Sequence, residues 1–185
     1  MKRTYIIASV LVCTLLLSAG MAAAQGSPTK AVSVNPLGLV FEIISAEYEM
    51  AILPGTTMGF QGLYWNPDLG DDLDLTAFGG AVGVRKYVTG RAFDGVYLGA
   101  YGGFASVSGD ARNSATDEWE SASATVVGIS GVAGIKWLAG NGFVADLGVS
   151  VGFPLSTTIS SGDISESDVS GVMDTTVYLS VGYAW

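Results

Sequence analysis

The sequence contains no histidine and a single cysteine, Cys13. The missing imidazole excludes Ser-His-Asp and Cys-His catalytic arrangements, imidazole metal sites and histidine-dependent lipid-modifying enzymes. Cys13 lies in the middle of an apolar N-terminal run, a position that argues against a lipid attached to it. We therefore expect a mature chain with no thiol, disulfide or lipid anchor, no metal or other cofactor, and no enzymatic activity.

Basic residues are also scarce. The chain has 8 Lys and Arg against 17 Asp and Glu, a formal net charge of −9. This balance disfavours nucleic acid as a partner and argues against a polybasic membrane patch. Charged residues make up only 14% of the chain while 49% are hydrophobic, whereas about a quarter are charged in an ordinary soluble domain. The apolar surface must therefore face something other than water.

The N-terminus has the three-part layout of a secretory signal. Lys2 and Arg3 precede an apolar stretch from Tyr5 to Leu17, and the small residues of positions 22–24 follow. A single membrane-spanning helix is the alternative, but the stretch is short for a bilayer core that needs about 20 apolar residues. We predict a signal peptide over residues 1–24, cleaved after Ala24, and one domain over residues 25–185.

Long hydrophobic runs are absent after residue 24, because every apolar run is broken by Gly, Ser, Thr or a charged residue. Spanning helices are therefore not expected, and a closed barrel is the other structure that satisfies all backbone polar groups in lipid. Its signature is segments of about 10 residues that alternate in hydrophobicity between turns.

The C-terminal segment shows this alternation clearly, with an apolar residue at every second position from Val177 to Trp185. Similar alternation and turn residues upstream predict eight strands of an all-β, antiparallel up-and-down transmembrane barrel, near residues 31–43, 44–53, 56–65, 75–88, 94–107, 121–138, 142–153 and 172–185. The Pro36-Leu37-Gly38 interruption predicts a bulge or bend in the first strand.

The predicted connections alternate in length. Turns near Pro54-Gly55, 89–93 and 139–141 are tight, whereas segments 66–74, 108–120 and 154–171 are long, polar and acidic. Tight turns on the periplasmic side and long loops outside are typical of outer-membrane barrels. Aromatic residues are expected to form two girdles at the membrane interfaces, a periplasmic one of Tyr87, Phe93, Tyr97, Trp137, Phe143, Tyr183 and Trp185, and an outer one of Phe41, Tyr64, Trp65, Phe78, Phe104 and Phe153.

The last strand resembles the C-terminal assembly signal of bacterial outer-membrane proteins, through Val177, Leu179, Val181, Tyr183 and Trp185. The whole mature region is similar to small OmpA-like and OmpX-like eight-stranded barrels. The segments Val32-Ser33-Val34-Asn35-Pro36-Leu37-Gly38 and Glu47-Tyr48-Glu49 also resemble the start of uncharacterised outer-membrane barrels. The resemblance implies an outer-membrane location, contact with its lipid and lipopolysaccharide, and insertion by the outer-membrane assembly machinery, and it brings no catalytic residues.

Five charged residues fall on the predicted lumen side of the strands: Glu47, Glu49, Arg85, Lys136 and Asp146. Buried charges in a narrow barrel must pair, because an unpaired charge in low dielectric is costly. We interpret the set as a charged plug in preference to a proton or ion path.

Two features of the predicted outer loops have alternative interpretations. The carboxylates of Asp68, Asp71, Asp72 and Asp74 could suit calcium, but the loop lacks the EF-hand pattern, so a solvated acidic loop is favoured. Trp119 is a candidate contact for a partner or a packing residue on the barrel rim.

Three functions remain open at this point. The favoured one is a non-enzymatic barrel with a structural, surface-interaction or adhesion role. The second is a narrow porin-like channel for ions or small solutes, and the third a soluble, secreted, lipocalin-like carrier. Small, polar and charged inward faces disfavour the carrier, because a lipid ligand requires apolar walls.

Overall fold

The computed structural model describes residues 27–67, 73–113, 118–161, 164–168 and 174–185. The predicted signal peptide and most of the acidic segment 68–74 lie outside these ranges. The described elements are one short helix and nine strands: β1 (Lys30–Val34), α2 (Pro36–Val40), β2 (Ile43–Leu53), β3 (Thr56–Trp65), β4 (Leu73–Tyr87), β5 (Gly95–Asn113), β6 (Glu118–Leu138), β7 (Phe143–Ser161), β8 (Ile164–Asp168) and β9 (Asp174–Ala184).

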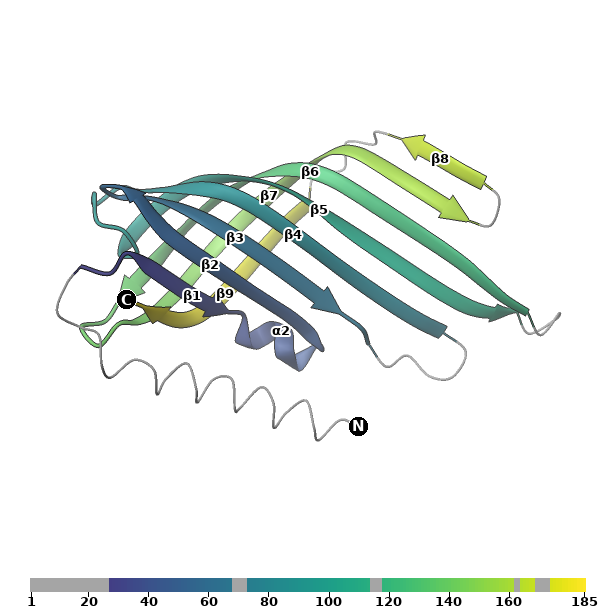
Figure 1. Ribbon diagram of the computed structural model, residues 1–185, viewed down its shortest axis with the longest axis horizontal. Coiled ribbons are helices and arrows are strands. Elements are labelled where there is room, and N and C mark those ends of the chain that lie inside the picture. The colour runs from purple at the N-terminus through teal and green to yellow at the C-terminus, as the bar shows by residue number, and fades with distance from the viewer. Residues whose placement is uncertain (1–26, 68–72, 114–117, 162–163, 169–173) are drawn as a thin grey trace.

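Eight of the described strands close into one antiparallel ring (Figure 1). From β2 to β7, each strand pairs with the next along the chain. Strand β9 pairs with β7, and the short β1 completes the ring between β9 and β2. Strand β8 pairs with the outer part of β7 and stands outside the ring. The predicted all-β, up-and-down antiparallel barrel of about eight strands is confirmed.

The two ends of the barrel differ. Short connections at 54–55, 88–94 and 139–142 join the strands at one end, which also holds the C-terminus and which we call the tight-turn end. At the opposite end, the long-strand end, β5, β6 and β7 extend well beyond β1, β2 and β3. The three short connections fall where tight turns were predicted, but β5 ends at Asn113 and β6 begins at Glu118, so the predicted long connection over 108–120 is wrong in its bounds.

Side chains alternate between the interior and exterior of the ring, as a pleated strand requires. On β4, Val82 and Val84 are exposed, while Arg85 and Tyr87 are buried. On β9, Val177 and Trp185 are exposed, and Tyr178 points inward toward Tyr97. The exterior of the barrel is therefore mostly apolar and the interior mostly polar.

The predicted first strand, 31–43, was wrong in its second half. Strand β1 ends at Val34, and helix α2 replaces the expected bulge at Pro36-Leu37-Gly38. Asn35 begins this helix, because its side-chain oxygen accepts hydrogen bonds from the backbone N–H groups of Leu37 and Gly38 at 3.0 and 3.1 Å. Pro36 favours the first helical position, where its missing N–H costs nothing. No helix in the described ranges is both long and apolar enough to cross a membrane.

Two predicted loops are largely strands. Strands β5 and β6 run through most of 108–120, and β7 and β8 occupy much of 154–171. These extensions are rich in Ser, Thr, Asp and Glu, and Asp110 of β5 accepts a hydrogen bond from Ser121 across the β5–β6 pair. Polar residues on both faces lack the apolar alternation of a lipid-facing strand, and this is why the sequence suggested loops.

The predicted periplasmic aromatic girdle also needs correction. Tyr87, Phe93 and Tyr97 are fully buried inside the barrel. Phe93 turns inward from the 88–94 connection and packs with Ala31, Val144 and Ala184 into an apolar base at the tight-turn end. Tyr183, another member of the predicted girdle, is also buried, and its ring stacks on that of Trp185 with ring centroids 6.3 Å apart. Trp137 and Trp185 are exposed as expected.

Candidate functional site

All five charged residues predicted for the lumen meet in one cluster inside the barrel. Strand β2 contributes Glu47 and Glu49, β4 contributes Arg85, β6 contributes Lys136 and β7 contributes Asp146. Each of the five is buried. The cluster lies toward the tight-turn end, directly above the apolar base. We call these five residues the plug.

Arg85 and Lys136 connect the carboxylates of the plug. Arg85 reaches Glu47 at 2.9 Å through Nη2, and it reaches both Glu49 and Asp146 at 3.3 Å through Nη1. Lys136 Nζ lies 2.5 Å from Glu49 and 3.3 Å from Asp146. Each cation therefore bridges carboxylates from different strands, and the plug ties together opposite walls of the ring.

Hydroxyl groups complete the coordination of the carboxylates. Tyr87 and Thr57 donate to Glu49 Oε1 at 2.7 and 2.5 Å. Tyr97 donates to Asp146 at 2.7 Å, and Tyr101 donates to Glu47 at 2.8 Å. Such bonds compensate the lost hydration of buried charge. Sequence analysis missed these four hydroxyl residues as members of the site.

A signal for the missed residues was present in the sequence. Because side chains alternate with period two, Tyr87 must share the face of Arg85, and Tyr97 and Tyr101 share a face with one another. Register supplies the rest: Thr57 lies directly opposite Arg85, and Lys136 lies opposite Asp146. Pairing register could not be deduced for separate strands without the structure.

The aromatic rings hold the guanidinium of Arg85 in place. Its central carbon lies 4.8 Å from the centroid of the Tyr97 ring and 5.4 Å from that of Tyr101. Contacts of this kind add to the ion pairs when the cation is desolvated. Arg85 Nε is the one buried side-chain polar atom in the described part of the chain with no hydrogen-bond partner.

Glycines opposite the plug make room for these large side chains. A Cβ at Gly59 would lie 2.5 Å from the Tyr101 hydroxyl oxygen and 3.0 Å from Glu47 Oε1. A Cβ at Gly148 would lie 2.5 Å from the Tyr178 ring. The glycine-rich strands of the sequence therefore serve the packing of a narrow interior.

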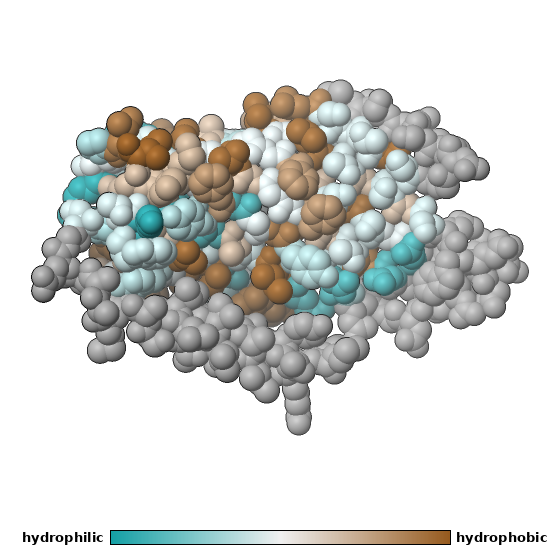
Figure 2. Space-filling view, viewed as in Figure 1, coloured by the Kyte–Doolittle hydropathy of each residue, from teal (hydrophilic) through white to brown (hydrophobic). Residues whose placement is uncertain are grey.

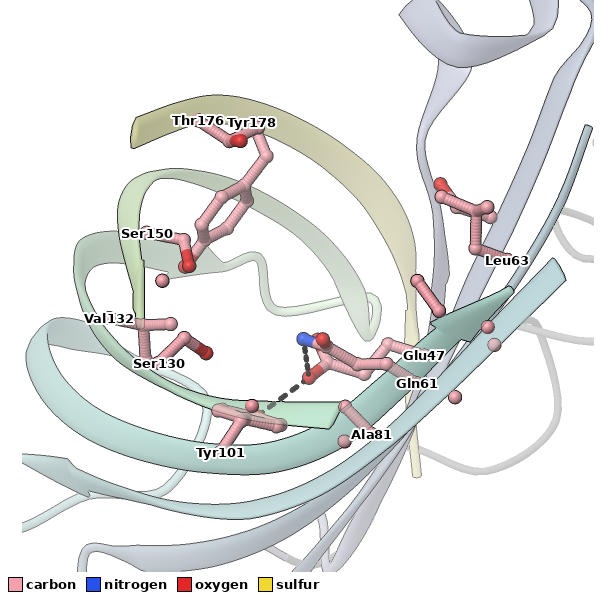
Figure 3. A pocket seen from close by; sticks show the side chains of 18 of the residues that line it. Glu47, Gln61, Leu63, Ala81, Tyr101, Ser130, Val132, Ser150, Thr176 and Tyr178 are labelled. Atoms are coloured by element: carbon pink, nitrogen blue, oxygen red, sulfur yellow. Dashed lines mark hydrogen bonds between the residues drawn. The ribbon is translucent and has the colours of Figure 1, made fainter. Parts of the chain in front are cut away.

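A cavity of about 750 Å³ lies on the other side of the plug, toward the long-strand end. Glu47, Arg85 and Tyr101 are among the residues that line it, and we call this cavity the cup. Figure 3 shows side chains from opposite walls converging on the cup, with Glu47 bonded to Gln61 and Tyr101. Small and hydroxyl side chains make up much of the inward wall: Ser33, Ser45, Gly79, Ala81, Gly103, Ser130, Ser150, Thr176 and Ser180.

No cluster in the described ranges combines three or more His, Cys, Asp or Glu residues in a way that could hold a metal ion. The calcium alternative for the acidic loop falls mainly on residues 68–72, outside the described residues. The side chain of Trp119 also lies outside them. The site therefore consists of a paired, hydrogen-bonded charge cluster that forms the floor of a cup whose walls combine hydroxyl groups with apolar surface.

The chain was compared with known families, curated proteins and solved structures. No curated protein matches the sequence. The crystal structure of Acinetobacter baumannii CarO2 is similar with a TM-score of 0.43 and 9% sequence identity, over 85% of this chain and 98% of that chain. The model of a family described as "Protein of unknown function (DUF3575)" matches residues 9–160, most of the sequence. The chain therefore belongs to the DUF3575 family.

Proposed function

We propose that this protein is an outer-membrane β-barrel with a closed lumen and a non-enzymatic, structural or surface-interaction role. The observation that carries the proposal is the plug. Its five charged side chains and the rings of Tyr87 and Tyr97 are buried across the lumen, with the apolar base beneath them. A conducting pore requires a continuous water-filled path, and this packing interrupts it at the tight-turn end.

The exterior of the barrel supports a membrane location. Exposed large apolar side chains occur on the ring strands from β2 to β9, and Figure 2 shows such residues in several groups across one face. Soluble monomers rarely expose contiguous apolar patches of more than a few hundred Å². Closure of the ring satisfies the strand hydrogen bonds that lipid cannot satisfy. The outward apolar residues include Phe60, Val82, Val84, Leu98, Phe104, Ile129, Leu147, Val149 and Val177.

The orientation of the barrel in the outer membrane follows from the connections between its strands. Barrels of this class place short turns in the periplasm and long strands and loops outside. The plug would then lie near the periplasm and the cup would face outward. Strand β9, with Val177, Leu179, Val181, Tyr183 and Trp185, would carry the assembly signal that the outer-membrane machinery reads, while the exposed apolar side chains contact lipid and lipopolysaccharide.

Planar-bilayer recording tests the closed lumen. We expect refolded wild-type protein to give no open-channel steps, because the plug leaves no wet path. A variant in which the five plug residues, Tyr87, Tyr97 and Phe93 are all replaced by serine is expected to conduct, since the large side chains that close the lumen are then removed. Removing every charge together avoids leaving a single charge buried without its partner.

Electrophoresis in SDS with and without boiling accompanies the recording as a check of folding. Closed membrane barrels resist SDS until heated, so wild type and the serine variant should both change mobility on boiling. Channel steps from heat-modifiable wild-type protein would contradict the closed lumen. A chain that is recovered from the periplasm in soluble form and shows no mobility change would contradict the membrane barrel itself.

A further inference from the structure

We infer that the cup is a binding site for a small, water-soluble organic cation that carries an ammonium or guanidinium group. The inference extends the proposed function and rests on it in one respect, because a plug near the periplasm makes the cup a blind pocket open toward the exterior. The volume of about 750 Å³ falls within the range of small-molecule pockets.

The plug carries an excess of negative charge. Three carboxylates, Glu47, Glu49 and Asp146, share two cations, Arg85 and Lys136. The cluster therefore has a formal charge of −1. Arg85 is fully buried, and its charge is already shared among all three carboxylates through Nη1 and Nη2, while Nε is its one nitrogen without an acceptor.

Glu47 is the plug carboxylate that reaches the cup. Its side chain is only 10% exposed, and Arg85, Tyr101 and Gln61 all donate to the same oxygen, Oε1. The second oxygen, Oε2, accepts no hydrogen bond from the described residues. A carboxylate oxygen that lacks a protein donor and borders a cavity is available to accept from a cationic donor.

The walls of the cup add further acceptors but no further cation. Three charged residues are among the described lining: Glu47, Arg85 and Asp174, the last at the start of β9. Gln61 donates to Glu47 through Nε2, so its carbonyl oxygen remains able to accept. Ser130, Ser150 and Thr176 provide hydroxyl groups.

The same features argue against other ligand classes. An anion would meet carboxylates on the floor and upper wall without a free cation. Calcium takes 6 to 8 oxygen ligands, whereas the cup offers one carboxylate at its floor. Apolar surface from residues such as Leu63, Ala81 and Val132 suits the hydrocarbon part of a ligand, but a wholly apolar acyl chain would cover the Glu47 carboxylate without supplying a donor. An organic molecule with an ammonium or guanidinium group fits the charge, the mixed polar and apolar lining and the volume together.

The test is isothermal titration of refolded wild-type barrel with three probes of similar length: 1,5-diaminopentane, 1,5-pentanediol and glutarate. We expect the diamine to bind, and to bind more weakly at high ionic strength. We expect little binding of the diol and none of glutarate. Equal binding of the diol and the diamine would overturn the inference in favour of a neutral, hydroxylated ligand, and no binding of the diamine would overturn it outright.

Three variants locate the site. Glu47→Gln keeps the shape and the acceptor for Arg85 but removes the charge, so diamine affinity should fall about tenfold or more. Asp94→Asn makes the same charge change at the tight-turn end, outside the cup, and should leave affinity unchanged. Ser150→Phe fills the cup from β7, four residues along the strand from Asp146, and should abolish binding even if Glu47→Gln fails to fold.

Diamine binding that survives both Glu47→Gln and Ser150→Phe would place the ligand elsewhere and overturn the inference. Failure of the cup to bind the diamine is distinguishable from failure of the proposed function. The closed lumen is judged by bilayer conductance and the membrane barrel by heat-modifiable mobility, whereas the cup is judged by binding of the diamine to the same preparation.

Discussion

Replacing Arg85 with methionine is expected to lower the free energy of unfolding by about 3–5 kcal/mol, the typical cost of removing one partner from a buried ion pair. Methionine preserves much of the side-chain volume but leaves Glu47, Glu49 and Asp146 with Lys136 as their one remaining cation. The measurement is the urea dependence of folding in phospholipid vesicles, followed by tryptophan fluorescence and by mobility in SDS.

The neighbouring residue Lys86 provides the matched control. It has the same charge and strand but points outward, where its ammonium donates to Pro54 O and Thr56 Oγ1 at 3.0 and 3.1 Å. Surface substitutions usually change stability by no more than about 0.5 kcal/mol, and Lys86→Met should cost far less than Arg85→Met. Equal effects of the two substitutions would show that the plug adds nothing specific to folding.

Replacing Val82 with arginine is expected to destabilise the folded barrel by about 2–4 kcal/mol, the cost of a basic side chain at the bilayer midplane of a membrane barrel. Val82 lies in the middle of β4 on the outer face and is 48% exposed. In a soluble barrel, arginine at an exposed position would be solvated by water and would cost little. The urea dependence of folding in vesicles separates these two environments.

Val88→Arg is the control for the depth of the substituted residue in the bilayer. Val88 is 71% exposed and follows β4 directly, at the tight-turn end. A basic residue near the interface is expected to cost about 0–1 kcal/mol. If Val82→Arg costs no more than Val88→Arg, the apolar exterior is not embedded in lipid, and the outer-membrane proposal is wrong.

Much of the barrel could be predicted from local pattern. Period-two alternation on the last strand and on the strand around Asp146 defined which residues point inward, and tight turns such as Pro54-Gly55 marked where strands end. The five plug residues were selected by the same rule, because charge on an inward face is rare and conspicuous. Their pairing partners were not predictable, since each bond of Arg85 and Lys136 joins strands far apart in sequence.

Local pattern failed where the environment of a strand changes. Beyond the ring, β5 and β6 continue as polar strands, because hydrogen bonding between them does not require an apolar face. At Pro36, a helix start and a strand bulge share the same residues, and the Asn35 side chain decides in favour of the helix. Tyr87 and Tyr97 were assigned to an interface girdle because rings are common there, yet their hydroxyl groups are bound to plug carboxylates.

By itself, the sequence determined the class of fold, because hydrophobic alternation, glycine content and turn residues are local properties that each strand carries independently. The tertiary structure alone decided which charges pair, that three carboxylates share two cations, and that a cup remains above them. Those properties depend on ring closure and strand register, which bring Glu47, Arg85, Lys136 and Asp146 from four separate strands within hydrogen-bonding distance of one another or of Glu49.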